Sequence, residues 1–393
     1  MLAPMCGKMD GETEMRAMFL VIAAVACSLG GAAATAADID AFEWSVKQAL
    51  APLAGKAVSD VKVVYLSADV QSWVDTGLTL KAGDRYTLLM DGTSWISRSR
   101  KVLLPTHSYV SSRVGEDGAA VRNVRDTNTI EAPRDGQLYL QHSSVRFLDT
   151  GPGPNLDAGG GVAVAVISWS AGADIPAVLA RLAQGKNAPE WAAAELARLK
   201  NPPAYPEGWA FPIGPSEAFQ EVEVKGDGGP ARRMQLHMTG GGGLLTKAAD
   251  RPLTPQTRLA WKWRMDSLPS KAAEDTIWTH DYVSIAVEFD NGRDLTYYWS
   301  AALPREDSFQ CPFPGWVNRE THLVVRSGKA DLGKWLAEER NVFEDYQKAV
   351  GGPMPKRIVN VWLLGVGFVS RLETDAAFGD IRLSDDTGTL QVF

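Results

Sequence analysis

The sequence contains few cysteines, with only 3 among its 393 residues. Cys6 and Cys27 fall within the N-terminal 37 residues, which we expect to be removed, so Cys311 alone remains. One cysteine forms no internal disulfide, and the chain therefore depends on its apolar core for stability. Nor does a lone cysteine make a structural zinc site, so the sequence predicts no cofactor of that kind.

An excess of positive charge is also missing. The net charge of the chain is -7, whereas proteins that bind nucleic acid need a basic footprint. Nucleic acid is therefore excluded as an expected partner.

Catalytic motifs are missing as well. The five histidines do not pair at the spacing of a helical metal site, and none lies near a Gly-x-Ser-x-Gly elbow. The glycine run at residues 240–243 matches neither a dinucleotide fingerprint nor a phosphate loop. A glycosidase would need two carboxylates at a defined separation, for which Glu274, Asp281, Glu288 and Asp290 are the candidates. The sequence therefore favours a protein that is not an enzyme and leaves an enzyme as the alternative.

The apolar run at residues 18–29 is too short to span a membrane in the mature chain. It follows Arg16, and Ala-Thr-Ala at residues 34–36 supplies the small-x-small pattern that signal peptidase accepts. We therefore predict a signal peptide over residues 1–37 and a periplasmic or secreted protein. The alternative is a lipoprotein anchored at Cys27, because the three residues before it form a loose lipobox.

What the sequence does contain is period-two alternation in two blocks. In the first block Leu78 and Leu80 alternate with polar residues, and in the second Trp261 and Trp263 flank Lys262. Such alternation, punctuated by glycine and aspartate, is typical of antiparallel strands with one buried face. We therefore predict a mainly β protein with two β-sandwich, jelly-roll-like domains joined by a short helical connector.

Helical periodicity precedes and separates these blocks. The connector ends at the Pro-Pro pair of residues 202–203, because proline does not continue a helix. Residues 332–350 also have helical spacing, whereas residues 98–130 are polar and poorly periodic, which predicts loops. The predicted parts are a signal peptide (1–37), an N-terminal helix (38–56), a lectin-like β-sandwich (57–172), a helical linker (173–203) and a second β-sandwich (204–393).

Short motifs occur in order along the C-terminal part: Leu-Ala-Trp-Lys-Trp at 259–263, Asp-Tyr-Val-Ser-Ile-Ala-Val-Glu-Phe at 281–289, Leu-Thr-Tyr-Tyr-Trp at 295–299, Glu-Arg-Asn-Val at 339–342 and Ala-Phe-Gly-Asp-Ile-Arg-Leu at 377–383. Through them, residues 204–385 resemble DUF3047, a bacterial domain of unknown function. The resemblance implies a β-sandwich of lectin-like or carbohydrate-module-like shape, with no established activity. The usual acidic pair of the family near Trp362 is replaced here by Gly-Val-Gly.

The N-terminal part carries Trp-Val-Asp-Thr-Gly-Leu-Thr-Leu-Lys-Ala-Gly-Asp at 73–84, Asp-Gly-Thr-Ser-Trp at 91–95 and Gly-Gln-Leu-Tyr-Leu at 136–140. These motifs resemble the galactose-binding lectin of the PA-I type. The resemblance implies the lectin fold. Most of the calcium-ligand set of that lectin is absent, because the strand ends Gln-His-Ser at 141–143, so the calcium-dependent sugar site is not expected to carry over.

Aromatic residues are the first candidates for a ligand site, because the chain has 13 tryptophans and flat rings stack on the apolar faces of sugars. The alternative interpretation is that sandwiches of this size need large core residues. Alternation places Tyr297 and Trp299 on one face of a strand and Tyr298 on the other, so only part of the set can line one groove. The candidate platform comprises Trp261, Trp263, Tyr297, Tyr298, Trp299 and Trp316.

A second candidate group follows in the chain and consists of Arg340, Asn341, Asp345 and Tyr346, which fall within two helical turns. These side chains either converge on a ligand or fix a helix to the sheet. Asp380 stands where several carbohydrate modules ligate a structural calcium ion, which requires an oxygen-rich cage. Calcium is therefore the one cofactor that the sequence leaves open.

The function that we expect from the sequence is that of an exported, non-catalytic binding protein. Its expected ligand is a glycan or another component of the cell envelope, bound through lectin-like sandwiches. Two alternatives remain open. A hydrolase or lyase acting on polysaccharide would need two facing carboxylates, and a structural or assembly protein of the periplasm would have an exposed apolar patch for its partner.

Overall fold

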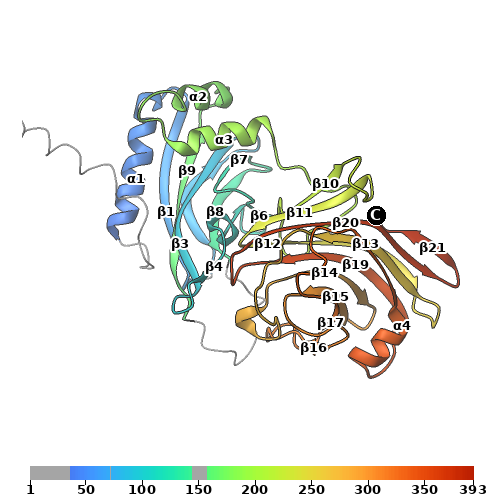
Figure 1. The fold of residues 1–393 in the computed structure, drawn as a ribbon. Helices are drawn as coiled ribbons and strands as arrows, with labels where there is room; N and C mark the ends of the chain where they lie inside the picture. The colour runs from blue at the N-terminus through green and yellow to red at the C-terminus, as the bar shows by residue number, and fades with distance from the viewer. Residues whose placement is uncertain (1–35, 71, 144–156) are drawn as a thin grey trace, which may run out of the picture. The chain divides into compact units, whose positions relative to one another are not determined.

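The structure of the chain, a computed structural model, describes residues 36–70, 72–143 and 157–393 (Figure 1). The predicted signal peptide, apart from its last two residues, and Cys27 lie outside the described residues. The described chain is mainly β and forms two sandwiches of two sheets each, as the sequence predicted. Among the described residues, no helix is both long and apolar enough to cross a membrane.

The N-terminal sandwich pairs a five-stranded sheet with a four-stranded one. Segment 98–130, predicted as loops, contains several short strands, because Val110 and Val114 point inward between polar neighbours. The larger sheet has the order β1 (Val58–Ser67), β9 (Gly159–Trp169), β3 (Arg85–Ser97) and β4 (Val102–Leu103), with β7 (Thr127–Glu131) also pairing with β3; the smaller sheet has the order β2 (Val74–Leu80), β8 (Gly136–His142), β5 (Val110–Val114) and β6 (Val121–Arg122); the short helix η2 (Thr106–Tyr109) precedes β5.

Helices cover the outer face of the larger sheet. Strand β9 is buried along its whole length, because one face packs in the sandwich core and the other against α1 (Ala36–Leu50), α2 (Ile175–Leu182) and α3 (Glu190–Lys200). The short helix η1 (Ala51–Leu53) follows α1. Asp174 starts α2 by accepting a hydrogen bond from the backbone N–H of Ala177 at 3.0 Å. The described helices α1, α2 and α3 therefore cover one of the two outer faces of the N-terminal sandwich.

The C-terminal sandwich is built from two six-stranded sheets. Strands β15 and β17 pair in parallel, and the other described strand pairs are antiparallel. The first sheet has the order β10 (Phe219–Glu223), β11 (Arg232–Thr239), β20 (Glu373–Asp385), β13 (Arg258–Met265) and β18 (Leu336–Asn341), with β21 (Gly388–Gln391) on β20; the second has the order β12 (Gly242–Pro252), β19 (Arg357–Val366), β14 (Tyr282–Phe289), β15 (Asp294–Ser300), β17 (Glu320–Ser327) and β16 (Ser308–Gln310).

The helix predicted at residues 332–350 is only half present. The first half contains strand β18 instead, because its backbone pairs with β13 at the sheet edge. A short helix α4 (Val342–Asp345) then continues into a π-helical turn, η5 (Tyr346–Val350). Asn341 marks the change, since its side chain accepts a hydrogen bond from the N–H of Glu344 at 3.3 Å.

Both faces of the second sheet are buried. Val283, Ile285 and Val287 point into the core between the two sheets, whereas Tyr282 and Ala286 belong to a separate apolar cluster on the outer face. Loops and the short helix η4 (Ile277–Thr279) surround this outer cluster. Polar side chains placed there are withdrawn from water, which makes this face the place to look for a site.

Candidate functional site

The predicted aromatic platform lies almost entirely in the interior. Each of its first five side chains is at most 1% exposed, and four of them pack between the sheets while Tyr298 faces the outer cluster. A buried ring offers no face to a sugar. Only Trp316 is partly exposed, with the guanidinium of Arg319 4.6 Å from its ring centre. The buried side chains are Trp261, Trp263, Tyr297, Tyr298 and Trp299.

The second candidate group is held together by its own hydrogen bonds. Arg340 donates to both carboxylate oxygens of Asp345, at 2.8 and 2.7 Å, and to Glu306 at 2.8 and 3.0 Å. The hydroxyl of Tyr297 donates to Asp345 at 3.1 Å, and Tyr346 accepts from Asn291 at 2.8 Å. These contacts tie η5 and a loop to the sheet, which is the structural alternative that the sequence left open.

Asp380 faces a cation that the chain itself supplies. Its carboxylate lies 2.8 Å from the ammonium of Lys262 on the neighbouring strand, and both side chains are nearly half exposed. The backbone of Asp380 is left-handed, with φ of 50°, next to a register shift between β13 and β20. Calcium binding at this position stays a prediction.

The carboxylates considered for hydrolysis are occupied by other protein groups. Glu274 accepts hydrogen bonds from Ser300 and from the backbone of Ala301 at 2.6 and 2.7 Å. Glu288 accepts hydrogen bonds from Arg319 and from Trp362. Asp281 accepts from the backbone N–H groups of Val369 and Ser370, and Asp290 accepts from the backbone N–H of Lys356. Each of the four candidate carboxylates is therefore hydrogen-bonded to other groups of the protein.

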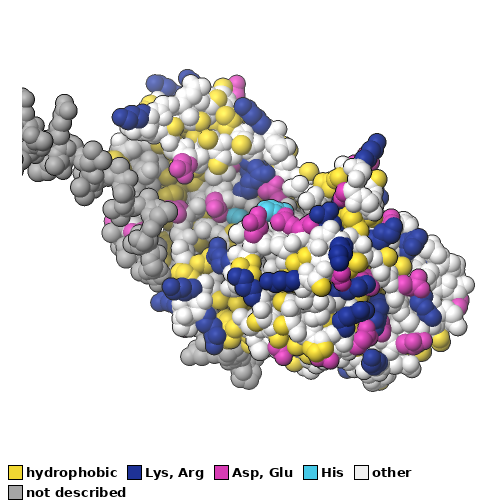
Figure 2. Space-filling model, viewed as in Figure 1, with side chains coloured by type: hydrophobic (Ala, Val, Ile, Leu, Met, Phe, Trp, Pro, Cys, Tyr) yellow, Lys and Arg dark blue, Asp and Glu magenta, His cyan; other side chains and the backbone are white. Residues whose placement is uncertain are grey.

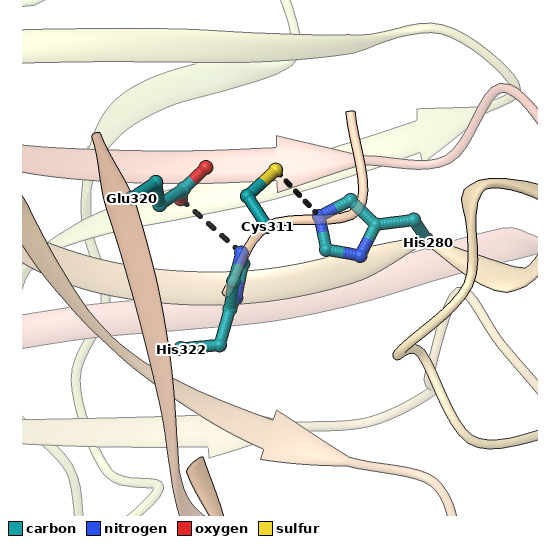
Figure 3. Close-up of side chains that lie close together, drawn as sticks. All are labelled: His280, Cys311, Glu320 and His322. Atoms are coloured by element: carbon teal, nitrogen blue, oxygen red, sulfur yellow. Dashed lines mark hydrogen bonds and ion pairs between the residues drawn. The ribbon is translucent and has the colours of Figure 1, made fainter. Parts of the chain in front are cut away.

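A group that the sequence did not single out converges on the covered outer face of the second sheet. Figure 3 shows the side chains of His280, Cys311, Glu320 and His322 pointing toward one another from separate segments. Each offers one donor atom, and all four donor atoms lie within 4.8 Å of one another. Each of the four residues is at most 4% exposed. Imidazole, thiol and carboxylate are the common protein ligands of transition metals.

The local fold explains how these residues meet. Glu320 and His322 alternate on β17, so both side chains point to the outer face while Leu323 points into the core. Cys311 directly follows β16, which pairs with β17. His280 directly follows η4 and lies two residues before the start of β14. The sequence signal that could have indicated this cluster is the Glu-x-His spacing of Glu320 and His322. Only the histidine spacing of helical metal sites was considered from the sequence, whereas side chains on one face of a strand repeat every two residues.

The distances within the cluster fall into two pairs. The sulfur of Cys311 is 3.5 Å from Nε2 of His280, and Oε1 of Glu320 is 3.5 Å from Nε2 of His322. Neither ring nitrogen of His322 makes a hydrogen bond among the described residues. The cluster therefore contains buried polar atoms that the protein alone leaves poorly paired.

Outer residues fix the orientation of the donors. Nδ1 of His280 lies 2.6 Å from the backbone carbonyl of Glu274, and because a carbonyl only accepts, Nδ1 carries the proton and Nε2 keeps its lone pair. The hydroxyls of Thr296 and Tyr282 donate to Oε1 of Glu320 at 2.8 and 3.3 Å. Such outer hydrogen bonds orient the ligands of metal sites in proteins.

Burial also sets the protonation of the cluster. Burial, followed by repulsion from His322, lowers the pKa of His280 to about 3, and burial raises the pKa of the Cys311 thiol. Burial alone would raise the pKa of Glu320, but His322 and the hydrogen-bond donors outweigh it and hold the pKa at about 2. Without an ion, the cluster is thus a carboxylate beside a neutral imidazole and a neutral thiol.

A second surface lies on the N-terminal sandwich, on the outward face of the β2-β8-β5-β6 sheet. The residues of β8 alternate between buried leucines and outward Gln137, Tyr139 and Gln141. Tyr139 pairs across the sheet with Asp75 on one side and Arg113 on the other. The guanidinium of Arg113 lies 4.3 Å from the ring centre of Trp73 and 5.4 Å from that of Tyr139. This face therefore combines two partly exposed rings with hydrogen-bonding groups.

Comparison with known proteins concerns mainly the C-terminal sandwich. Residues 217–382 match the model of a family described as a protein of unknown function, DUF3047. No curated protein matches the sequence.

Among solved structures, the chain is similar to the N-terminal domain of EclA, a PllA-like lectin, at 19% identity, covering 27% of this chain and 95% of that one with a TM-score of 0.23. A family 30 carbohydrate-binding module of a Clostridium thermocellum cellulosomal cellulase is 9% identical and covers 45% of this chain and 90% of that one, with a TM-score of 0.25. The xyloglucanase domain of NopAA from Sinorhizobium fredii is 12% identical, covering 46% and 95%, with a TM-score of 0.28.

The motifs and the family model both place the resemblance to DUF3047 in the C-terminal sandwich.

Proposed function

We propose that the protein is an exported, non-catalytic binding protein whose N-terminal sandwich binds glycan across the outward face of the β2-β8-β5-β6 sheet. The observation that carries this proposal is the arrangement of Trp73, Arg113 and Tyr139 on one open sheet face. Sugars present apolar ring faces and a rim of hydroxyls, so they need flat apolar contacts next to donors and acceptors.

The polar groups on this face are already held in position. Thr79 donates to the side-chain oxygen of Gln137 at 2.7 Å, and the amide of Gln137 donates to Asp75 at 3.0 Å. Side chains fixed in this way lose little conformational freedom when a ligand binds. An extended chain of sugars lying along the strands would meet the two rings and this polar row together.

Surface charge agrees with a neutral or polar ligand. Basic and acidic side chains lie among one another over the C-terminal sandwich on the face drawn in Figure 2, and the chain as a whole is weakly acidic. Binding of nucleic acid, which needs a strongly basic surface, is therefore not proposed.

Binding is tested with a glycan array followed by calorimetry on the mature chain. We expect a hit of modest affinity, weakened at least about tenfold by Trp73→Ala or Tyr139→Ala, since each removes a stacking ring from the face. Trp44→Ala is the matched control, because Trp44 is 67% exposed on α1 and lies on a different element. Absence of binding across the array, or equal weakening by the control, would overturn the proposal.

Export is tested separately by cell fractionation and mass spectrometry of the N-terminus. Cleavage after Ala36 or Ala37 and recovery from the periplasm or medium would support a simple signal peptide. An acylated chain that begins at Cys27 would replace that proposal with lipid anchoring. Full-length protein in the cytoplasm would overturn both.

A further inference from the structure

We infer that His280, Cys311, Glu320 and His322 bind one zinc ion. This inference is independent of the glycan proposal, because it concerns the other sandwich and a buried cluster instead of an open face. The four donor atoms come from one thiol, two imidazoles and one carboxylate, and all lie within 4.8 Å of one another. Zinc takes four ligands of these types in tetrahedral geometry.

The two measured donor distances agree with that geometry. Zinc–nitrogen bonds of about 2.0 Å, zinc–oxygen bonds of similar length and zinc–sulfur bonds of about 2.3 Å give tetrahedral edges of roughly 3.3 Å between nitrogen and oxygen and roughly 3.5 Å between sulfur and nitrogen. The observed separations are 3.5 Å for Glu320 Oε1 and His322 Nε2, and 3.5 Å for Cys311 Sγ and His280 Nε2. Two edges of the expected tetrahedron are therefore already close to their bonded lengths.

Charge balance selects a divalent ion. The surroundings are aromatic, with the rings of Tyr282, Phe309 and Phe313 centred 4.7 to 5.0 Å from the imidazole of His280 or His322. An isolated charge is costly in such a shell. Thiolate and carboxylate together supply two negative charges, so a divalent ion makes the whole site neutral once the thiol proton has been released.

The donor set also discriminates among metals. Calcium and magnesium prefer oxygen ligands, which are a minority here. Copper also binds two imidazoles and a thiolate, but its electron-transfer sites have a weak and distant further ligand. In this chain that position is taken by a carboxylate oriented by two hydrogen bonds from Thr296 and Tyr282. Four protein ligands without an open position describe a structural zinc site.

The position of the cluster indicates what the ion would do. Cys311 begins the connection between β16 and β17, and His280 lies in the loop between η4 and β14. A shared ion would fasten both segments to β17 on the outer face of the sheet. In a mature chain expected to hold one cysteine, a metal takes the role that disulfides have in many exported proteins.

The first test is metal analysis by mass spectrometry of the full mature chain, refolded with zinc and dialysed against a weak chelator. We expect about one zinc per chain. Cys311→Ser and His322→Asn should lower the zinc content at least about tenfold. His107→Asn is the matched control, because His107 lies on η2 of the N-terminal sandwich and its imidazole pairs with Asp126 at 3.0 Å. Full zinc content in Cys311→Ser, or less than about a tenth of an ion in the wild type, would overturn the inference.

The second test keeps the wild-type chain, so it does not depend on the folding of a variant. Cobalt substituted for zinc should give the intense visible bands of a tetrahedral ion and a thiolate charge-transfer band. X-ray absorption at the zinc edge should show one sulfur and three lighter ligands. A site that loads copper in preference, with a strong thiolate-to-copper band, would overturn the assignment to zinc.

Thr296→Val separates a positioning role from simple packing. Valine has nearly the same shape but removes the hydroxyl that orients Glu320. We expect zinc affinity to fall about 10- to 100-fold, measured by competition with a chromogenic chelator, while the fold is retained. Unchanged affinity would overturn the positioning role of Thr296.

Discussion

The two sandwiches use the outer faces of their sheets in opposite ways. In the N-terminal sandwich, the outward face of the β2-β8-β5-β6 sheet keeps Trp73, Arg113 and Tyr139 partly exposed. In the C-terminal sandwich, the corresponding outer face of the β12-β19-β14-β15-β17-β16 sheet buries His280 and His322 beneath loops. Alternation along a strand therefore tells which residues share a face, but not whether that face meets water.

The two sandwiches also differ in the surroundings of their buried histidines. His142 in the N-terminal sandwich is 3% exposed, stacks on Tyr109 and lies 2.9 Å from the hydroxyl of Ser94. One hydroxyl satisfies one ring nitrogen, and this histidine behaves as a packed core residue. His280 and His322 instead meet a thiol and a carboxylate. Convergence of donors from separate segments, and not burial of a histidine, distinguishes a site from a core.

The sharpest test of the contrast between inside and outside compares two tryptophans. Trp263 is fully buried and packs against Trp261, Trp299 and Phe378, so Trp263→Ala should lower the free energy of unfolding by about 3–5 kcal/mol. Trp73→Ala, on the open face, should cost less than about 1 kcal/mol. Urea unfolding followed by fluorescence measures both. Similar losses in the two variants would mean that the face around Trp73 is part of a packed interior.

Acid should destabilise the N-terminal sandwich through His142. Burial lowers the pKa of His142 from its ordinary 6.5 to about 4, so between these values the unfolded chain binds the proton and the folded chain does not. Stability is therefore complete above about pH 6.5 and is lost as the pH falls toward 4, by about 3 kcal/mol.

Chemical denaturation across this pH range, compared with His142→Gln, isolates the effect. Glutamine keeps a polar atom near Ser94 but does not titrate, so the variant should lose correspondingly less stability in acid. Identical pH profiles for the two proteins would contradict a neutral buried His142.

The smallest effect is expected at Asp380, which forms an exposed ion pair with Lys262. Asp380→Asn should change the free energy of unfolding by less than about 1 kcal/mol, because surface ion pairs contribute little and asparagine tolerates the left-handed backbone. Differential scanning fluorimetry with and without calcium checks this and also tests the calcium prediction. A rise in Tm with calcium that the variant lacks would support calcium binding at Asp380.

Sequence reasoning succeeded where one physical signal dominates. Period-two alternation at Trp261 and Trp263 placed both side chains on the core side of β13, and the Pro-Pro pair after Asn201 placed the end of α3. It was less successful in segment 98–130, because strands of two to five residues have too few positions for alternation to stand out. At residues 332–350, helical spacing predicted a helix throughout, but only the second half is helical. The first half contains β18, because its backbone pairs with β13.

The candidate site was largely beyond the sequence. His280, Cys311 and His322 are separated by 31 and 11 positions, and only the pairing of β16 with β17 and the fold of the loop before β14 bring them together. The inference that one cysteine makes no zinc site considered cysteine alone, whereas histidine and carboxylate complete a mixed set. The sequence also did not show that the aromatic platform is buried. Alternation along a strand places a tryptophan on one face, and the pattern is the same whether a second sheet or a ligand covers that face.

The parallel pairing of β15 with β17 has a consequence for the order in which the chain assembles. Neighbouring antiparallel strands can close through a tight turn, but a parallel neighbour must wait until the intervening segment has crossed back. Residues 301–319, which include β16 and Cys311, form that crossing. We expect this part of the sheet to be the slowest to form, so that a stretch of fewer than twenty residues governs the kinetics of refolding.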